Sequence, residues 1–235
     1  MRNFLKLAHK SERMKEGDFA SIEFTGRIKD TDEVFDTTSE EMAKLAGVYN
    51  EKTNYGAVPI IVGANQVIPG LEEAIKEMNV SDKKKVEIPP EKAFGIRNPE
   101  LVKLLPMSVF KDNRLEPSPG RTVNFNGLQG RILTVDGGRI KVDFNHPLAG
   151  RTIEYEIEIK DEIKESDQKV KSVVRYFTGI KHEDANAIVN GNETTIRMQK
   201  LDFPKQVKQG IADTIMKWVD GISKVSFIDV FEKKN

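Results

Sequence analysis

One stretch of the sequence, residues 58–78, restricts the fold more than any other. A short apolar run ends at Gly63, and Pro69-Gly70 then opens a segment whose apolar side chains recur at i, i+3, i+4 and i+7. Glu72 and Glu73 in its first turn complement the positive end of a helix dipole. The apolar positions are Leu71, Ala74, Ile75 and Met78. The stretch therefore predicts a strand, a turn and a short helix buried along one face, with an apolar pocket where the helix begins.

The composition excludes several kinds of chemistry. The chain has 235 residues and no cysteine, which excludes disulfides, thiol catalysis and zinc–thiolate sites. Its histidines, His9, His146 and His182, lack the spacing of metal ligands, so we expect no metal and no cofactor. The 37 basic and 37 acidic residues balance, which argues against dedicated nucleic-acid binding. No apolar run is long enough to cross a membrane and no signal peptide is recognisable, so the expected location is the cytoplasm.

Alternating apolar and polar residues predict an antiparallel sheet. Residues 18–25 form the first expected strand, and further strands are expected at 34–35, 59–62 and 83–88. The longest alternation, residues 152–159, predicts a strand with one face on a core. Its apolar face consists of Ile153, Tyr155, Ile157 and Ile159. The lysines at 83–85 indicate a solvated sheet edge rather than a ligand site.

Two further segments differ in character from this sheet. Residues 97–110 are rich in large apolar side chains broken by prolines, and short strands are expected after them at 122–125, 128–134 and 139–143. Asp136-Gly137-Gly138 predicts a hairpin between the last two. Strand and helix patterns alternate along the C-terminal part of the chain, which predicts a small α/β module. Its expected elements are a strand at 171–177, a helix at 182–189, a strand at 193–198, a helix at 204–219 and a strand at 224–231.

Several segments, taken in order, resemble the FKBP family of peptidyl-prolyl isomerases. They are residues 22–26 (IEFTG), 34–37 (VFDT), 62–63 (VG), 66–72 (QVIPGLE), 86–95 (VEIPPEKAFG) and the strand at 152–159. The insertion, with LPMSVF at 105–110 and NHPLAG at 145–150, is similar to that of SlyD-type long-chain members. The C-terminal segment resembles an appendix of archaeal long-chain members. The similarity to the catalytic domain covers roughly half of the chain.

This resemblance implies an α+β fold, in which an antiparallel FKBP-type sheet wraps on a short helix. A small β module is inserted, and a small α/β module follows at the C-terminus. The expected boundaries are an N-terminal arm at 1–13, a discontinuous catalytic domain at 14–96 and 143–163, an inserted client-binding module at 97–142 and a C-terminal module at 164–235. By default the arm is expected to be frayed.

The implied activity is peptidyl-prolyl cis-trans isomerisation, which needs an apolar pocket and no covalent step. Carried over from the family, the catalytic residues are Asp36, Phe24, Ile68, Phe94 and Tyr155. The substrate-binding residues are Phe35, Val67, Leu71, Leu148 and Ala149. Judged by spacing alone, the apolar ones among them would be core residues and Asp36 a turn residue.

The sequence departs from the family at three of these positions. Phe24 and Phe94 lack the hydroxyl of the tyrosines common there, and Leu71 replaces a tryptophan that often floors the pocket. We therefore predict a lower intrinsic rate and weak macrolide binding. An isomerase assay on a short peptide tests the first of these.

The implied partners are unfolded or partly folded proline-containing polypeptides. In the insert, the expected client-binding residues are Leu101, Leu104, Leu105, Met107, Val109 and Phe110. We favour a part-exposed groove over a small core of the module's own. The alternative function is a holdase or docking chaperone with a weak or vestigial isomerase site, and the basic residues Arg2, Lys6, Lys10 and Arg13 would suit docking on RNA. Homodimerisation through the C-terminal module is left open at this stage.

Overall fold

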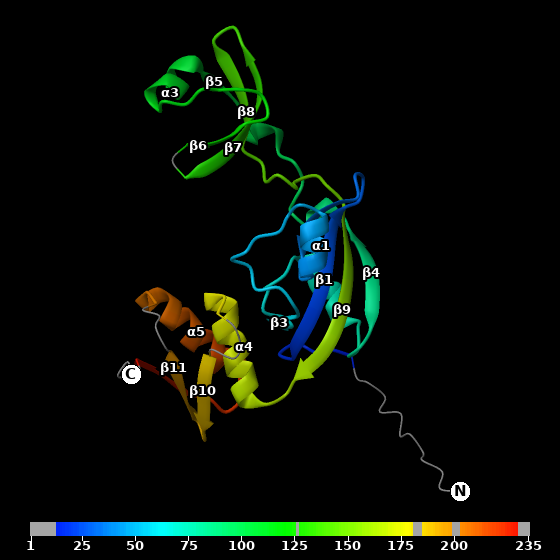
Figure 1. Cartoon of the computed structure of the whole chain (residues 1–235), viewed down its shortest axis with the longest axis vertical. Coiled ribbons are helices and arrows are strands. Elements are labelled where there is room, and N and C mark those ends of the chain that lie inside the picture. Colours follow the sequence, from blue (N-terminus) through cyan, green and yellow to red (C-terminus); the bar gives the residue numbers. More distant parts are fainter. Residues whose placement is uncertain (1–12, 126, 181–184, 199–202, 230–235) are drawn as a thin grey trace, which may run out of the picture. The chain divides into compact units, whose positions relative to one another are not determined.

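The computed structural model describes residues 13–125, 127–180, 185–198 and 203–229 (Figure 1). The predicted arm at 1–13 lies outside these residues apart from Arg13. Contacts divide the chain into two compact units. Unit 1 comprises the chain up to Ile88 and from Ile153 onward, and unit 2 is Pro89–Thr152. In the described residues, no helix combines the length and apolar character needed to span a bilayer.

Unit 1 contains an antiparallel sheet with the strand order β2-β1-β9-β4, and β3 also pairs with β1. The strands are β1 (Phe19–Ile28), β2 (Glu33–Thr37), β3 (Val58–Ile61), β4 (Lys83–Ile88) and β9 (Ile153–Ile163). Figure 1 shows β1 and β9 lying side by side as its two longest strands. The prediction for residues 152–159 is confirmed, because Ile153, Tyr155, Ile157 and Ile159 are all buried. The intervening glutamates of β9 lie on the opposite face.

Two short helices accompany this sheet, α1 (Glu40–Leu45) and α2 (Pro69–Lys76). The predicted helix is confirmed, and Leu71, Ala74, Ile75 and Met78 are all buried. Gly70 permits its close packing on β4, because a Cβ there would lie 2.4 Å from Cγ2 of Ile88. The buried side chain of Glu72 accepts a hydrogen bond from the Gly63 backbone N–H, which ties α2 to the turn before it.

The outer face of the sheet is covered with paired charges. Lys83 binds Glu158 at 3.1 Å and Lys85 binds Glu154 at 2.7 Å, both from β4 to β9. Lys84 points the other way and binds Glu77 at 2.7 Å. The strand order places β4 at an edge of the sheet, as the run of lysines predicted.

Unit 2 is a small sheet with the strand order β5-β8-β7-β6, all pairs antiparallel. Its elements are β5 (Val102–Pro106), α3 (Met107–Asp112), β6 (Thr122–Phe125), β7 (Leu128–Asp136) and β8 (Arg139–Asp143), with short 3-10 helices at Pro90–Lys92 and Pro99–Leu101. The predicted hairpin between β7 and β8 is confirmed. One face of the sheet carries a core of Phe110, Val123, Ile132, Ile140 and Val142.

The C-terminal segment has the predicted α/β character, but two of its elements were predicted wrongly. Residues 171–177 belong to a helix, α4 (Ser166–Thr178), and not to a strand. The described part of 182–189 belongs to a strand, β10 (Ala185–Asn190), and not to a helix. The valines of α4 caused the first error, because β-branched residues favour strands locally although Val170, Val173 and Val174 have helical spacing. Gly179 ends α4 in a left-handed conformation with φ of 66°.

The remaining C-terminal elements match the prediction. They are β11 (Glu193–Met198), α5 (Lys205–Trp218) and β12 (Lys224–Asp229). Strand β11 lies between β10, which is antiparallel to it, and β12, which is parallel to it. The parallel pair requires a crossover, and α5 provides it.

One hydrophobic core joins the C-terminal segment to the first strands of unit 1. Phe19 of β1 and Ile61 of β3 pack with Val173 of α4 and with Ile211 and Ile215 of α5. All five side chains are at most 3% exposed. The expected boundary between 163 and 164 therefore marks a change of architecture within one compact unit.

Candidate functional site

The junction of β1 and β2 contains a β-bulge that positions two of the predicted site residues. Gly26 pairs with Asp36 but Arg27 pairs with Val34, so Phe35 is the extra residue of the bulge. Buried Thr38 fixes the end of β2, because its N–H donates to the Phe24 carbonyl at 3.0 Å and its hydroxyl accepts from the Phe24 N–H at 2.9 Å. The bulge and these bonds hold Phe35 and Asp36 in place on the edge strand.

Asp36, Gly26 and Tyr155 form one row across three adjacent strands. Gly26 of β1 is paired with Asp36 of β2 on one side and with Tyr155 of β9 on the other. Residues paired in this way share a face of the sheet. A Cβ at Gly26 would lie 2.8 Å from Cζ of Phe35 and 2.9 Å from Cε1 of Tyr155. The missing side chain thus allows the two rings to meet over β1.

Three aromatic rings form the wall of this site. The centroid of the Tyr155 ring lies 5.6 Å from that of Phe24 and 5.8 Å from that of Phe35. Both pairs are edge-to-face, an arrangement that aromatic quadrupoles favour. The prediction named all three residues, and the structure brings them together.

The site has one carboxylate whose environment is partly apolar. Burial raises the pKa of the Asp36 carboxyl, and a hydrogen bond from the Thr37 backbone N–H opposes that rise. Asp36 as a whole residue is exposed, so the carboxyl lies at the rim of the apolar surface. Burial, and secondly the charge of Asp36, raise the pKa of Tyr155, which keeps its phenol protonated. The hydroxyl that Phe24 lacks is therefore present near Asp36 on a different strand.

The start of α2 presents a backbone donor. Ile68 is the N-cap of this helix in an extended conformation, with φ of −61° and ψ of 148°. Its carbonyl accepts from the N–H groups of Leu71 and Glu72 at 3.0 and 3.1 Å. Within the described part of the chain, none of the hydrogen bonds uses the Ile68 N–H. Such a donor beside half-buried Val67 suits the carbonyl of a bound polypeptide.

The other predicted site residues are distributed as follows. Leu71 is buried in α2. Phe94, Leu148 and Ala149 belong to unit 2, where Phe94 stacks on His146 with ring centroids 4.7 Å apart. The Leu148 N–H donates to Nδ1 of His146 at 3.1 Å. Sequence reasoning did not assign roles to Gly26, Thr38 or His146. For Gly26 the available signal was a glycine inside a strand pattern, which indicates a bulge or a close approach.

The predicted client-binding residues of unit 2 separate into two groups. Leu101 and Leu104 are 41% and 56% exposed. Leu105, Met107 and Val109 are partly buried against the core of the unit. Phe110 is completely buried in that core, so it offers no surface to a client. The segment therefore combines both interpretations, a small core and an exposed apolar rim.

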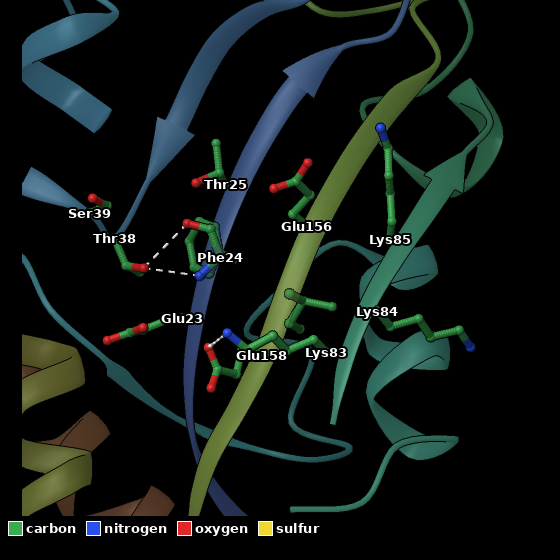
Figure 2. A pocket seen from close by; sticks show the side chains of 11 residues that line it. Glu23, Phe24, Thr25, Thr38, Ser39, Lys83, Lys84, Lys85, Glu156 and Glu158 are labelled. Carbon is green, nitrogen blue, oxygen red and sulfur yellow. Dashed lines mark hydrogen bonds and ion pairs between the residues drawn. The ribbon is translucent and has the colours of Figure 1, made fainter. Parts of the chain in front are cut away.

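A hollow of about 450 Å³ lies on the outer face of the sheet in unit 1. Figure 2 shows its lining, with Glu156 and Glu158 on β9, the lysines of β4, and Thr38 bonded to Phe24. Ion pairs such as Lys83–Glu158 neutralise most of these charges. The lining also includes Ile157 and Phe24 of the ring wall, so the hollow combines apolar side chains with paired charges. Among the described residues, no group of three or more histidines and carboxylates is placed to hold a metal ion.

Comparison with known proteins gives a consistent result. A family model described as "FKBP-type peptidyl-prolyl cis-trans isomerase" matches residues 10–111, and one described as "FKBP26, IF domain" matches residues 103–148. A short-type peptidyl-prolyl cis-trans isomerase from Methanocaldococcus jannaschii is 35% identical over 148 residues, which are 63% of this chain and 93% of that protein. An FKBP-type 16 kDa isomerase from Escherichia coli is 32% identical, covering 48% of this chain and 80% of that protein. SlyD from Helicobacter pylori is 31% identical, covering 42% of this chain and 55% of that protein.

Proposed function

Because this chain belongs to the FKBP-type peptidyl-prolyl cis-trans isomerase family and is such an isomerase, we propose that it is also a chaperone, in which unit 2 holds unfolded clients for the isomerase site. Its partners on this proposal are unfolded or partly folded polypeptides that contain proline. The assignment of the isomerase site rests on one aromatic cluster. The rings of Phe24, Phe35 and Tyr155 form one wall, and Asp36 lies at its rim.

The reaction needs no nucleophile, which agrees with a site made of rings and one carboxylate. Rotation about an X–Pro bond is slow because the C–N bond has double-bond character, and it takes about 10–100 s without a catalyst. Twisting the bond removes resonance and makes the imide less polar. An apolar wall therefore favours the twisted form over the planar one. Lowering the barrier by about 4–6 kcal/mol would accelerate the reaction by three to four orders of magnitude.

Two groups would orient the substrate in this site. The Ile68 N–H would donate to a substrate carbonyl, because no other bond of the described residues uses it. The Asp36 carboxylate would interact with the rotating imide from the rim of the ring wall. Neither group changes its covalent state, so the site works through position and desolvation.

The chaperone half of the proposal rests on the exposed apolar side chains of unit 2. Leu101 and Leu104 flank or belong to β5, an edge strand of its sheet. The family model described as "FKBP26, IF domain" covers residues 103–148, which lie within this unit. A client held on unit 2 stays tethered to the isomerase site, which raises the local concentration of prolyl bonds.

Refolding assays separate the two halves. The substrates would be a folding protein limited by a prolyl step and a proline-containing tetrapeptide. We expect Leu101→Ser/Leu104→Ser to slow the catalysed refolding about tenfold while tetrapeptide isomerisation stays within about twofold. Leu45→Ser is the control, since Leu45 is a leucine of unit 1 that is even more exposed, at 76%, and it should change neither rate.

Two outcomes would reject parts of the proposal. Equal refolding rates for wild type and the double variant would remove the client-holding role. No acceleration of either substrate by wild type, together with suppressed client aggregation, would make the chain a holdase.

The C-terminal module suits homodimerisation, which we include in the proposal. Ile188 of β10 and Ile228 of β12 are each 44% exposed and share the sheet face that points away from the core. Pairing two such faces would bury both residues in each copy. Light scattering at micromolar concentration tests this: Ile188→Asp should convert a dimer into a monomer, and a monomeric wild type would exclude the dimer.

A further inference from the structure

Unit 2 contains a pocket whose lining shares Ala149 with the predicted substrate-binding residues but includes neither Asp36 nor the ring wall of Phe24, Phe35 and Tyr155. It has a volume of about 470 Å³ and lies over the solvent face of β6, β7 and β8. Thr122, Arg131 and Asp143 form a row across these three strands, since Arg131 pairs with both others. The hydrophobic core of the unit occupies the opposite face, where Gly130 packs against Val142 and Phe144.

The lining of this pocket is strongly basic. It includes three arginines, Arg97, Arg131 and Arg151, but only one carboxylate, Asp143. Asp143 already binds Arg97 at 2.5 Å and accepts from the Asn145 backbone N–H at 3.0 Å. Burial raises the pKa of Asp143, but these donors more than offset that effect and hold it below its usual value. Arg131, on the solvent face of β7, forms no ion pair with any described residue, so its guanidinium is open to a ligand.

The walls of the pocket are held in place by a paired segment, residues 95–98 with 143–150. The Gly150 N–H donates to the Gly95 carbonyl at 2.9 Å, and the Asn98 N–H donates to Oδ1 of Asn145 at 2.8 Å. The Asn145 side chain in turn donates to the Asn98 carbonyl at 3.0 Å. The basic groups are thus presented by a braced backbone, which lowers the entropic cost of binding a ligand.

The chemistry of the lining favours a carboxylate as the ligand. Guanidinium groups form bidentate pairs with carboxylates, and the Gln129 amide and Thr122 hydroxyl add neutral hydrogen-bonding groups. The volume suits one or two side chains of a polypeptide. Binding to single-stranded nucleic acid would instead call for an extended basic groove with aromatic stacking platforms, and the lining contains no phenylalanine, tyrosine or tryptophan. The sequence of unit 2 has ten basic and six acidic residues, which would draw acidic chains toward it.

We propose that this pocket binds side-chain carboxylates of unfolded client polypeptides, so that the protein selects acidic clients. This inference rests on the client-holding role proposed above and names the class of client. Apolar residues such as Leu104 provide general affinity, and the arginines add a charge preference. The preference falls with ionic strength, because the guanidinium groups are solvent-accessible.

A pair of labelled, unfolded peptides tests the inference. Both contain the same apolar residues and one proline, but one has glutamate where the other has glutamine. Measured by fluorescence anisotropy at low salt, wild type should bind the glutamate peptide about tenfold more tightly. Arg131→Gln should reduce that ratio to about twofold. Arg131→Lys should give an intermediate value, because lysine keeps the positive charge but cannot form the bidentate pair of a guanidinium group.

Arg139→Gln is the matched control, since Arg139 is an exposed arginine of β8 outside the pocket. It should leave the ratio unchanged, and all three arginine variants should keep wild-type activity on a tetrapeptide. A ratio near one for wild type, or an equal loss in Arg139→Gln, would overturn the inference. Displacement of the glutamate peptide by oligouridylate more readily than by polyglutamate would assign the pocket to phosphates and overturn it as well. If neither peptide binds, the client-holding role fails too, whereas binding without preference removes only the acidic selectivity.

Discussion

At the scale of single residues, the site depends on what Gly26 lacks. The backbone of β1 passes directly under the rings of Phe35 and Tyr155, and any Cβ there would overlap them. Asp36 reaches the same row only because the bulge at Phe35 shifts the register of β2. The geometry of the proposed site therefore follows from one absent side chain and one β-bulge.

Gly26→Ala should destabilise the protein by about 1–3 kcal/mol, because the added methyl overpacks the ring cluster. Denaturant unfolding measures this change in free energy. The double variant Gly26→Ala/Phe35→Ala should show a smaller loss than the two single losses added together, since truncation of Phe35 relieves the overlap. Simple additivity would contradict a clash at this point.

Asp36→Asn should lower kcat/KM for a proline tetrapeptide about tenfold, which corresponds to about 1.4 kcal/mol of transition-state stabilisation. Glu33→Gln, an exposed carboxylate of the same strand, should have no effect. Because burial raises the pKa of Asp36, wild-type activity should fall as the pH drops through that raised pKa. The activity of Asp36→Asn should be flat over the same range.

Ionisation of Asp36 should also affect the free energy of unfolding, but in the opposite direction to ionisation of a salt-bridged aspartate. The folded-state pKa is raised, so the charged carboxyl costs stability above that pKa and costs nothing below the unfolded-state pKa. Asp36→Asn should therefore slightly stabilise the fold at neutral pH. The effect is small because Asp36 is exposed.

At the scale of elements, α2 is fixed by contacts at its first turn. Gly70 packs on Ile88, and Glu72 binds the Gly63 N–H although its side chain is buried. Gln66 adds a bond from the Ile61 N–H to its Oε1 at 2.7 Å. The N-terminus of the helix, with Val67 and Ile68, is thereby tied to β3.

Glu72→Ala should destabilise unit 1 by about 1–3 kcal/mol, because it leaves the Gly63 N–H without its partner. Glu72→Gln should cost much less, since the amide oxygen still accepts that bond. Thermal unfolding compares the two variants. Equal losses for both would mean that the carboxylate charge matters and not the hydrogen bond.

At the scale of the whole molecule, the C-terminal segment and the isomerase sheet share one core. Phe19 and Ile61 would be exposed to water without α4 and α5. An appended module of independent stability would need its own complete core, and this one borrows two residues from the sheet. We therefore expect both parts of unit 1 to unfold together.

Val173→Ala should cost roughly 2 kcal/mol by opening a cavity in that shared core. Hydrogen exchange locates the loss: amides of β1 and β9 should exchange faster, as should those of α4. Amides of β7 and β8 in unit 2 provide the internal control and should not change. Faster exchange confined to the C-terminal segment would show that the two parts are independent.

Local patterns determined much of this protein. The alternation at 152–159 specified which face of β9 is buried, because the side-chain period of a strand is two. The spacing after Pro69 specified α2 and its buried face. The segments from 22–26 to 86–95 indicated the family, and with it the ring residues Phe24, Phe35 and Tyr155.

The rest depended on contacts between residues distant in sequence, which no local pattern encodes. The valines of α4 adopt a helical conformation because Val173 and Val174 pack in the shared core with Ile211 and Ile215. This packing overrides the local preference of valine for strands. Phe110 is buried because α3 folds onto its own small sheet. The three arginines of the basic pocket lie at 97, 131 and 151, and only strand pairing and the braced loop bring them together. Periodicity reports which side of an element is apolar, but the partner that covers it is chosen by the tertiary fold.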